Sequence, residues 1–249
     1  MILGIDTAAG RCGVALVSGG SIVAAASEPM ERGHAERLFP LLETALAEAG
    51  VGVEAIRRIG VCTGPGSFTG LRVGVAAARG LALGRAIPAV GITRFEAVAT
   101  AIARPDITMC HRAEAGTSFS LPGATPPRTA PRAVEQKVGW AESRPIAVAL
   151  AGRGTVFLQR FGPDLTALGE PALLAPETLA AAAEARDVKA GDGWAAAGLA
   201  PDLMPDGLAD PALVAALAEG RSPDPLPAPL YLRGADADPP REAPPVLLD

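Results

Sequence analysis

Three short apolar runs at the start of the chain constrain its fold more than any other feature. Residues 2–6, 12–17 and 21–26 are apolar or alternate between apolar and polar, and the turns between them are Thr7-Ala8-Ala9-Gly10 and Ser18-Gly19-Gly20. Runs of this length, separated by glycine and serine, are typical of strands joined by tight turns. We therefore expect the chain to open with three antiparallel strands.

Helical and strand patterns alternate after these strands. Apolar residues recur at helical spacing over residues 35–49, and Gly50 ends the pattern. Further patterns predict strands at 58–62 and 87–92 and helices at 69–83 and 93–103. Three antiparallel strands followed by alternating helices and parallel strands indicate an α/β protein with a mixed sheet, as in the actin-like ATPase and ribonuclease H-like fold.

The remainder of the chain predicts a reduced second lobe, with a hairpin at 145–161 and helices at 176–186 and 211–219. Residues 106–144 contain prolines and no sustained apolar period. We interpret them as a mobile surface insertion; a translated reading-frame error and a binding element are the alternatives. The predicted organisation is an N-terminal actin-like lobe at 1–105, an irregular insertion at 106–144, a reduced C-terminal lobe at 145–233 and a flexible tail at 234–249.

A glycine-rich loop precedes the helix predicted at 69–83. Such loops bind phosphate when backbone N–H groups and a helix N-terminus meet an anion. The loop lacks the Gly-Lys-Ser/Thr ending of a Walker loop, because Leu71 and Arg72 follow Gly70. The glycine spacing also departs from the dinucleotide fingerprint. A ligand-binding loop and a tight strand-to-helix turn remain as alternatives.

The helix after this loop is apolar on all sides, so either the core or a partner must bury it. One stripe consists of Leu71, Val75, Ala78 and Ala82. The neighbouring Gly70, Gly74 and Ala77 form a smooth surface that another helix could approach closely, and Arg72 and Arg79 flank it.

Composition and charge exclude several classes of protein. The chain has 249 residues, a formal net charge of −5 and 4% aromatic residues, which argues against a protein that grips nucleic acid by itself. The three cysteines, Cys12, Cys62 and Cys110, have no C-x-x-C spacing, so neither a disulfide framework nor a zinc ribbon is expected. With no run of about 20 apolar residues and no signal peptide, we expect a cytoplasmic protein without a membrane span.

Candidate catalytic residues are sparse. His34 is followed at the i+4 position by Leu38, and His111 lies in the irregular insertion, so no metal site is expected. Asp6 ends the first strand, but the strand predicted around residues 146–151 carries no second aspartate. Neither a two-metal nuclease nor an actin-like ATPase is therefore supported by the carboxylates.

Four segments together resemble the TsaB (YeaZ) family, bacterial proteins that partner TsaD in making threonylcarbamoyladenosine at position 37 of tRNA. They are residues 2–7 (ILGIDT), 34–38 (HAERL), 63–84 (TGPGSFTGLRVGVAAARGLALG) and 229–233 (PLYLR). The resemblance implies a non-catalytic scaffold or activator subunit of the tRNA threonylcarbamoyl transferase complex. It implies a TsaD-type catalytic subunit as partner, a TsaE-type ATPase in the same complex, a homodimer as an alternative assembly, and contact with tRNA only through the complex.

The resemblance also implies which residues meet the partner. TsaB-type proteins use their first two helices to form a helical bundle with TsaD or with a second copy. The corresponding candidates here are His34, Leu38, Leu41, Leu42, Ala45, Gly70, Leu71, Arg72, Gly74, Val75, Ala78 and Arg79.

Cofactors are expected to be absent, apart from weak ATP or ADP binding at a degenerate pocket around Asp6, Thr7 and Gly10. An aspartate that only orders its turn is the alternative for Asp6. The chain departs from the family at Ala151-Gly152-Arg153, where relatives commonly show Asp-Ala-Arg. The alternative functions are a stand-alone actin-like ATP-dependent phosphotransferase and, with less support, a metallopeptidase.

Overall fold

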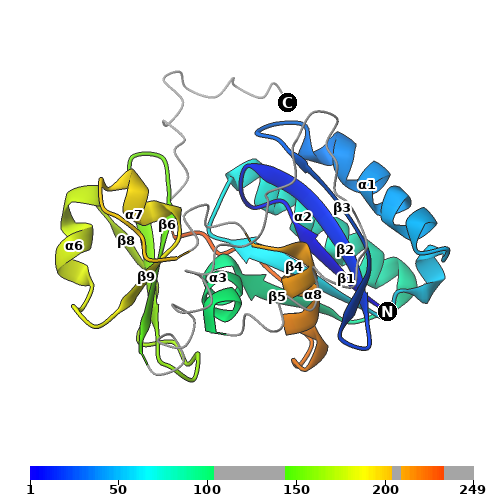
Figure 1. Ribbon diagram of the computed structural model, residues 1–249. Helices are drawn as coiled ribbons and strands as arrows, with labels where there is room; N and C mark the ends of the chain where they lie inside the picture. Colours follow the sequence, from blue (N-terminus) through cyan, green and yellow to red (C-terminus); the bar gives the residue numbers. More distant parts are fainter. Residues whose placement is uncertain (104–143, 204–208, 233–249) are drawn as a thin grey trace, which may run out of the picture.

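The computed structural model describes residues 1–103, 144–203 and 209–232, which form two lobes, each built on one sheet (Figure 1). The sheet of the first lobe has the strand order β3-β2-β1-β4-β5. Its strands are β1 (Ile2–Asp6), β2 (Arg11–Ser18), β3 (Ser21–Pro29), β4 (Arg58–Gly64) and β5 (Ala89–Thr93). The first three are antiparallel, whereas β4 runs parallel to both β1 and β5. The predicted mixed sheet and fold class are confirmed.

Helices cover both faces of this sheet because successive side chains of a strand point to opposite faces. On one face, α1 (His34–Glu48) and α2 (Phe68–Arg85) pack against Leu3 and Ile5 of β1. On the other face, α8 (Pro211–Glu219) packs against β1, β2 and β4. The short 3-10 turn η1 (Val53–Ala55) leads into β4.

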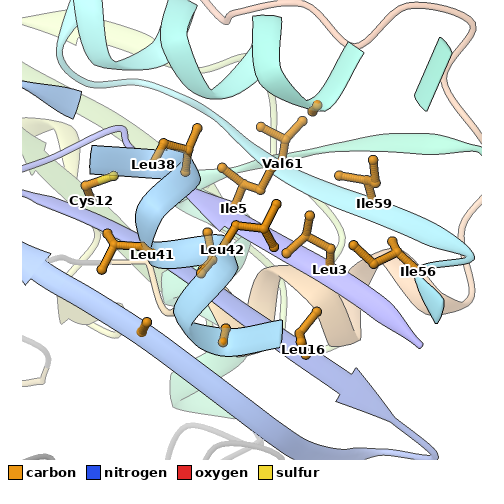
Figure 2. Packing of buried hydrophobic residues seen from close by; sticks show 14 of the residues in the cluster. Leu3, Ile5, Cys12, Leu16, Leu38, Leu41, Leu42, Ile56, Ile59 and Val61 are labelled. Carbon is orange, nitrogen blue, oxygen red and sulfur yellow. The ribbon is translucent and has the colours of Figure 1, made fainter. Parts of the chain in front are cut away.

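The inner faces of α1 and α2 fill the core of the first lobe, as Figure 2 shows for α1. This corrects the predicted partner interface, because a side chain buried in its own core cannot meet another protein. In α2, Val75 is only 2% exposed. The predicted interface residues buried in this way are Leu38, Leu41, Leu42, Ala45, Leu71, Val75 and Ala78.

The position of α8 corrects the predicted domain boundary. Residues 145–233 were expected to form the C-terminal lobe, yet α8 lies on the sheet of the first lobe. The two elements approach so closely that a Cβ atom added to Gly4 would lie 1.8 Å from the Pro211 carbonyl oxygen. The chain therefore returns to the first lobe after building the second.

The sheet of the second lobe has the order β8-β7-β6-β9 and repeats the pairing of the first four strands of the chain. The strands β6 (Ile146–Ala151), β7 (Val156–Phe161) and β8 (Ala172–Leu174) are antiparallel, and β9 (Val188–Ala190) runs parallel to β6. The helix predicted at 176–186 is only a 3-10 turn, η2 (Pro176–Thr178), and one helical turn, α6 (Leu179–Ala182). A further short helix, α7 (Asp192–Ala196), follows β9.

Between the lobes lies α3 (Arg94–Ala103), whose apolar side chains join the core of the second lobe. The predicted insertion at 106–144, apart from Arg144, and the predicted tail at 234–249 lie outside the described residues. Among the helices that the structure describes, each is too short or too polar to cross a membrane.

Candidate functional site

A cleft of about 880 Å³ lies between the two lobes. The first lobe contributes the loop after β1 (residues 8–10) and the glycine-rich loop with the first turn of α2 (65–69). The second lobe contributes residues 151–153, Phe157 and Asp192, and the C-terminal segment adds residues 230–232. Loops at the carboxyl ends of parallel strands from both lobes meet there, which is where α/β folds place ligand sites.

The glycine-rich loop is a close-packed turn. A Cβ atom added to Gly66 would lie 1.9 Å from the Ala8 carbonyl oxygen, and one added to Gly70 would lie 2.1 Å from the Thr7 carbonyl oxygen. At Gly74 the added Cβ would lie 2.3 Å from Thr7 Oγ1. Gly70 and Gly74 therefore pack against their own chain, which corrects their assignment to a partner surface.

Asp6 and Thr7 lie beneath the cleft and do not line it. Asp6 is fully buried, and its Oδ1 accepts a 3.0 Å hydrogen bond from the Ala8 N–H, so it orders the turn. Its Oδ2 has no hydrogen bond within the described part of the chain. Burial raises the pKa of Asp6 above its usual value, against the opposing effects of Arg11, the Ala8 N–H and Arg94. Of the three predicted nucleotide contacts, only Gly10 lines the cleft.

One buried arginine links the lobes. Arg94, the first residue of α3, is 2% exposed. Its Nη1 donates to the Pro65 carbonyl oxygen at 3.2 Å, and its Nη2 lies 3.4 Å from Asp192 Oδ2. Asp192 Oδ1 in turn accepts a 2.9 Å hydrogen bond from the Ala151 N–H. A carboxylate therefore does reach the end of β6, although the strand itself carries none.

Sequence reasoning missed both Arg94 and Asp192. Arg94 could have been noticed as a charged residue between an apolar strand and an apolar helix. Asp192 lies just beyond the end of β9, but β9 has only three residues and gives no pattern. Among the described residues, no three histidine, cysteine, aspartate or glutamate side chains gather closely enough to hold a metal ion.

Arg72 and Arg79 make contacts within the chain. Arg72 stacks over Phe68, with its Cζ 3.7 Å from the ring centroid, and its Nε donates to the Tyr231 hydroxyl at 3.0 Å. Phe68 and Tyr231 form an aromatic rim on the cleft. Arg79 Nε donates to the Pro227 carbonyl oxygen at 2.7 Å and so ties the C-terminal segment to α2.

His34 is the first residue of α1. Gly33 is the capping residue, and no side chain caps the helix. The His34 side chain is buried away from the cleft, with Nε2 making no hydrogen bond to any described residue. Burial corrects its assignment to a partner contact.

Three comparisons place the chain among known proteins. The family model described as TsaD, tRNA N6-adenosine threonylcarbamoyltransferase, matches residues 26–118. The Escherichia coli K12 protein named tRNA threonylcarbamoyladenosine biosynthesis protein TsaB is 40% identical over 98 residues. Over this stretch the chain is similar to the TsaB (YeaZ) proteins. The match with this TsaB covers 39% of the chain and 42% of the relative, so it spans less than half of each.

Other relatives extend the comparison. A TsaB from Haemophilus influenzae is 37% identical over 100 residues, covering 40% of this chain and 42% of the relative. A tRNA N6-adenosine threonylcarbamoyltransferase from Geobacter sp. strain M21 is 46% identical over 69 residues, 28% of this chain and 20% of the relative. The solved structure of YeaZ from Pseudomonas aeruginosa has a TM-score of 0.64 and 23% identity, covering 93% of this chain and 99% of that one. At this identity, the structural likeness shows the fold alone.

Proposed function

We propose that this chain is a non-catalytic scaffold or activator subunit in the formation of threonylcarbamoyladenosine at position 37 of tRNA. The observation that carries the proposal is the 40% identity, over 98 residues, to a protein named for this biosynthesis. Catalysis would belong to a TsaD-type partner. A TsaE-type ATPase would join the complex, and tRNA would be held chiefly by the TsaD-type subunit.

The chemistry of the cleft supports a non-catalytic role. Asp6 is buried, and its pKa is raised, so its ionised form is disfavoured. The guanidinium of Arg94 lies where the two lobes meet. His34, the one histidine within the described ranges, does not line the cleft, so it cannot serve there as a base.

The outer faces of α1 and α2 are the surface that we assign to the TsaD-type partner. Their inner faces are occupied by the core, but Phe39 of α1 and Leu83 of α2 are exposed, Leu83 to 85%. Ala76 and Gly80 are exposed in the middle of α2, and their small size would let a helix of the partner approach closely. A homodimer would use the same faces, so it would exclude the heterodimer.

Light scattering after size-exclusion chromatography would test this assignment, using the chain alone and mixed with TsaD-type protein from the same organism. We expect a 1:1 complex. Leu83→Glu should weaken it, because the interface would have to bury an unpaired charge. Leu168→Glu is the matched control, since Leu168 is an exposed leucine of the second lobe. Absence of a complex, or equal effects of both substitutions, would contradict the proposal.

A second role of the cleft is weak binding of ATP or ADP. Its volume suits a small ligand, and the exposed Phe68 and Tyr231 offer rings on which a base could stack. Calorimetric titration with ADP should give weak binding that Tyr231→Ala reduces. ATP turnover by the purified chain alone would instead support the phosphotransferase alternative, and stoichiometric zinc or iron would support the metallopeptidase.

A further inference from the structure

The cleft is lined by a buried cationic side chain, that of Arg94. The Arg94 guanidinium is almost fully buried, and it contacts the glycine-rich loop of the first lobe through the Pro65 carbonyl oxygen. On its other side it lies against Asp192 of the second lobe. It also acts electrostatically on the carboxylate of Asp6.

Two carboxylates from different lobes therefore share the field of one guanidinium. Asp6 is fully buried at the end of β1 and has Arg11 as its other cationic neighbour. Asp192 is held against the end of β6 by the Ala151 N–H. Buried charges are tolerated only when they are paired, so the buried Arg94 guanidinium depends on Asp192.

A divalent metal ion would need the same position. Magnesium and manganese bind carboxylate oxygens, commonly one or two from the protein. Asp192 offers such an oxygen in the cleft, with Asp6 buried beneath it, but the Arg94 guanidinium already stands against Asp192 where the lobes meet. The residues present therefore do not fit a metal ion at this point, because two cations would repel at short range.

We infer that Arg94 is the resident cation of the cleft, joining Asp192 of the second lobe to the first lobe in the place that a divalent metal would otherwise take. This inference concerns the cleft alone and does not depend on the proposed partner. It predicts that removing the guanidinium, and nothing else, will make the cleft receptive to a divalent metal.

Manganese titration of the full chain, followed by the electron paramagnetic resonance signal of free Mn²⁺, would test the inference. We expect the wild-type chain to show no saturable site. Arg94→Met keeps much of the side-chain length without the charge, so it should gain one Mn²⁺ site per chain. The double variant Arg94→Met/Asp192→Asn should lose that site again.

Arg94→Lys is the matched control, because it keeps a positive charge at the position and should bind no Mn²⁺. A wild-type site that Asp6→Asn or Asp192→Asn abolishes would overturn the inference. So would a folded Arg94→Met chain that binds no more Mn²⁺ than the wild type. If Arg94→Met does not fold without metal, recovery of its thermal unfolding transition by Mn²⁺ supports the inference, and failure to recover counts against it.

Discussion

The hydroxyl of Thr7 donates a 2.7 Å hydrogen bond to the carbonyl oxygen of Gly70, which joins the loop after β1 to the first turn of α2. The contact is possible because Gly70 has no side chain: a Cβ atom there would lie 2.1 Å from the Thr7 carbonyl oxygen. This hydrogen bond and the close approach at Gly70 therefore hold together two segments that are far apart in sequence.

Gly70→Ala should destabilise the protein by about 1–3 kcal/mol, because overpacking forces the backbone of the Thr7 loop to shift. Gly80→Ala is the matched control within the same helix. Nothing lies within 4 Å of a Cβ atom at Gly80, so alanine should stabilise the helix by about 0.5–1 kcal/mol. Urea unfolding of both variants checks this, and effects of the same sign would contradict the packing at Gly70.

Leu38→Ala should reduce the free energy of unfolding by about 2–5 kcal/mol, since it leaves a cavity in the core of the first lobe. Leu83→Ala should change it by less than about 0.5 kcal/mol, because Leu83 is exposed. Chemical denaturation distinguishes the two. A small effect of the Leu38 substitution would contradict the burial of Leu38 in the core.

Cys12 and Cys62 should resist alkylation in the native protein. Burial raises the pKa of the Cys12 thiol from its ordinary 9.0 to about 11, which makes its thiolate about 100 times rarer at pH 8. Burial raises the pKa of Cys62 as well. Peptide mass spectrometry after iodoacetamide treatment should find both thiols protected until denaturant is added. Rapid native labelling of either would disprove their burial.

Asp6→Asn should change how stability depends on pH. Burial raises the pKa of Asp6 in the folded state, so wild-type folding favours the protonated carboxyl. Stability from this group is therefore present below its unfolded pKa and is lost as pH rises through the folded pKa. Asparagine keeps the acceptor for the Ala8 N–H without this loss. The melting temperature of the variant, relative to wild type, should rise with pH.

Asp164→Asn provides a control of opposite sign. Hydrogen bonds from Thr166 lower the pKa of Asp164, so this exposed carboxylate adds stability above its unfolded pKa that is lost as pH falls. Its replacement should lower the relative melting temperature as pH rises. Parallel pH profiles for the two variants would contradict the account of Asp6.

The first lobe could be predicted from the sequence because its elements are long enough to carry a period. Residues 35–49 predicted a helix, and α1 spans His34–Glu48. The prediction placed the strand after this helix at 58–62, and β4 spans Arg58–Gly64. From the sequence, the apolar helix at 69–83 could be buried either by the core or by a partner. In the structure, its inner face is buried in the core of the first lobe.

The second lobe and the cleft could not be predicted in the same way. The strands β8 and β9 have three residues each, too few for an alternation to stand out. The apolar pattern of α8 shows that the helix is buried but not which sheet buries it. Arg94 and Asp192 are 98 positions apart in the chain, and a local sequence pattern cannot predict a contact between residues so far apart.

Because α8 lies on the sheet of the first lobe, the first lobe is not one uninterrupted stretch of chain. Cutting the gene after residue 203 would remove the helix that closes one face of the sheet, leaving Ile2, Ala15 and Val17 uncovered. An excised first lobe would need residues 209–232 spliced back onto residues 1–103. The strands of the second lobe, by contrast, lie between the two parts of the first, but their core also needs α3 and the C-terminal Leu230 and Leu232.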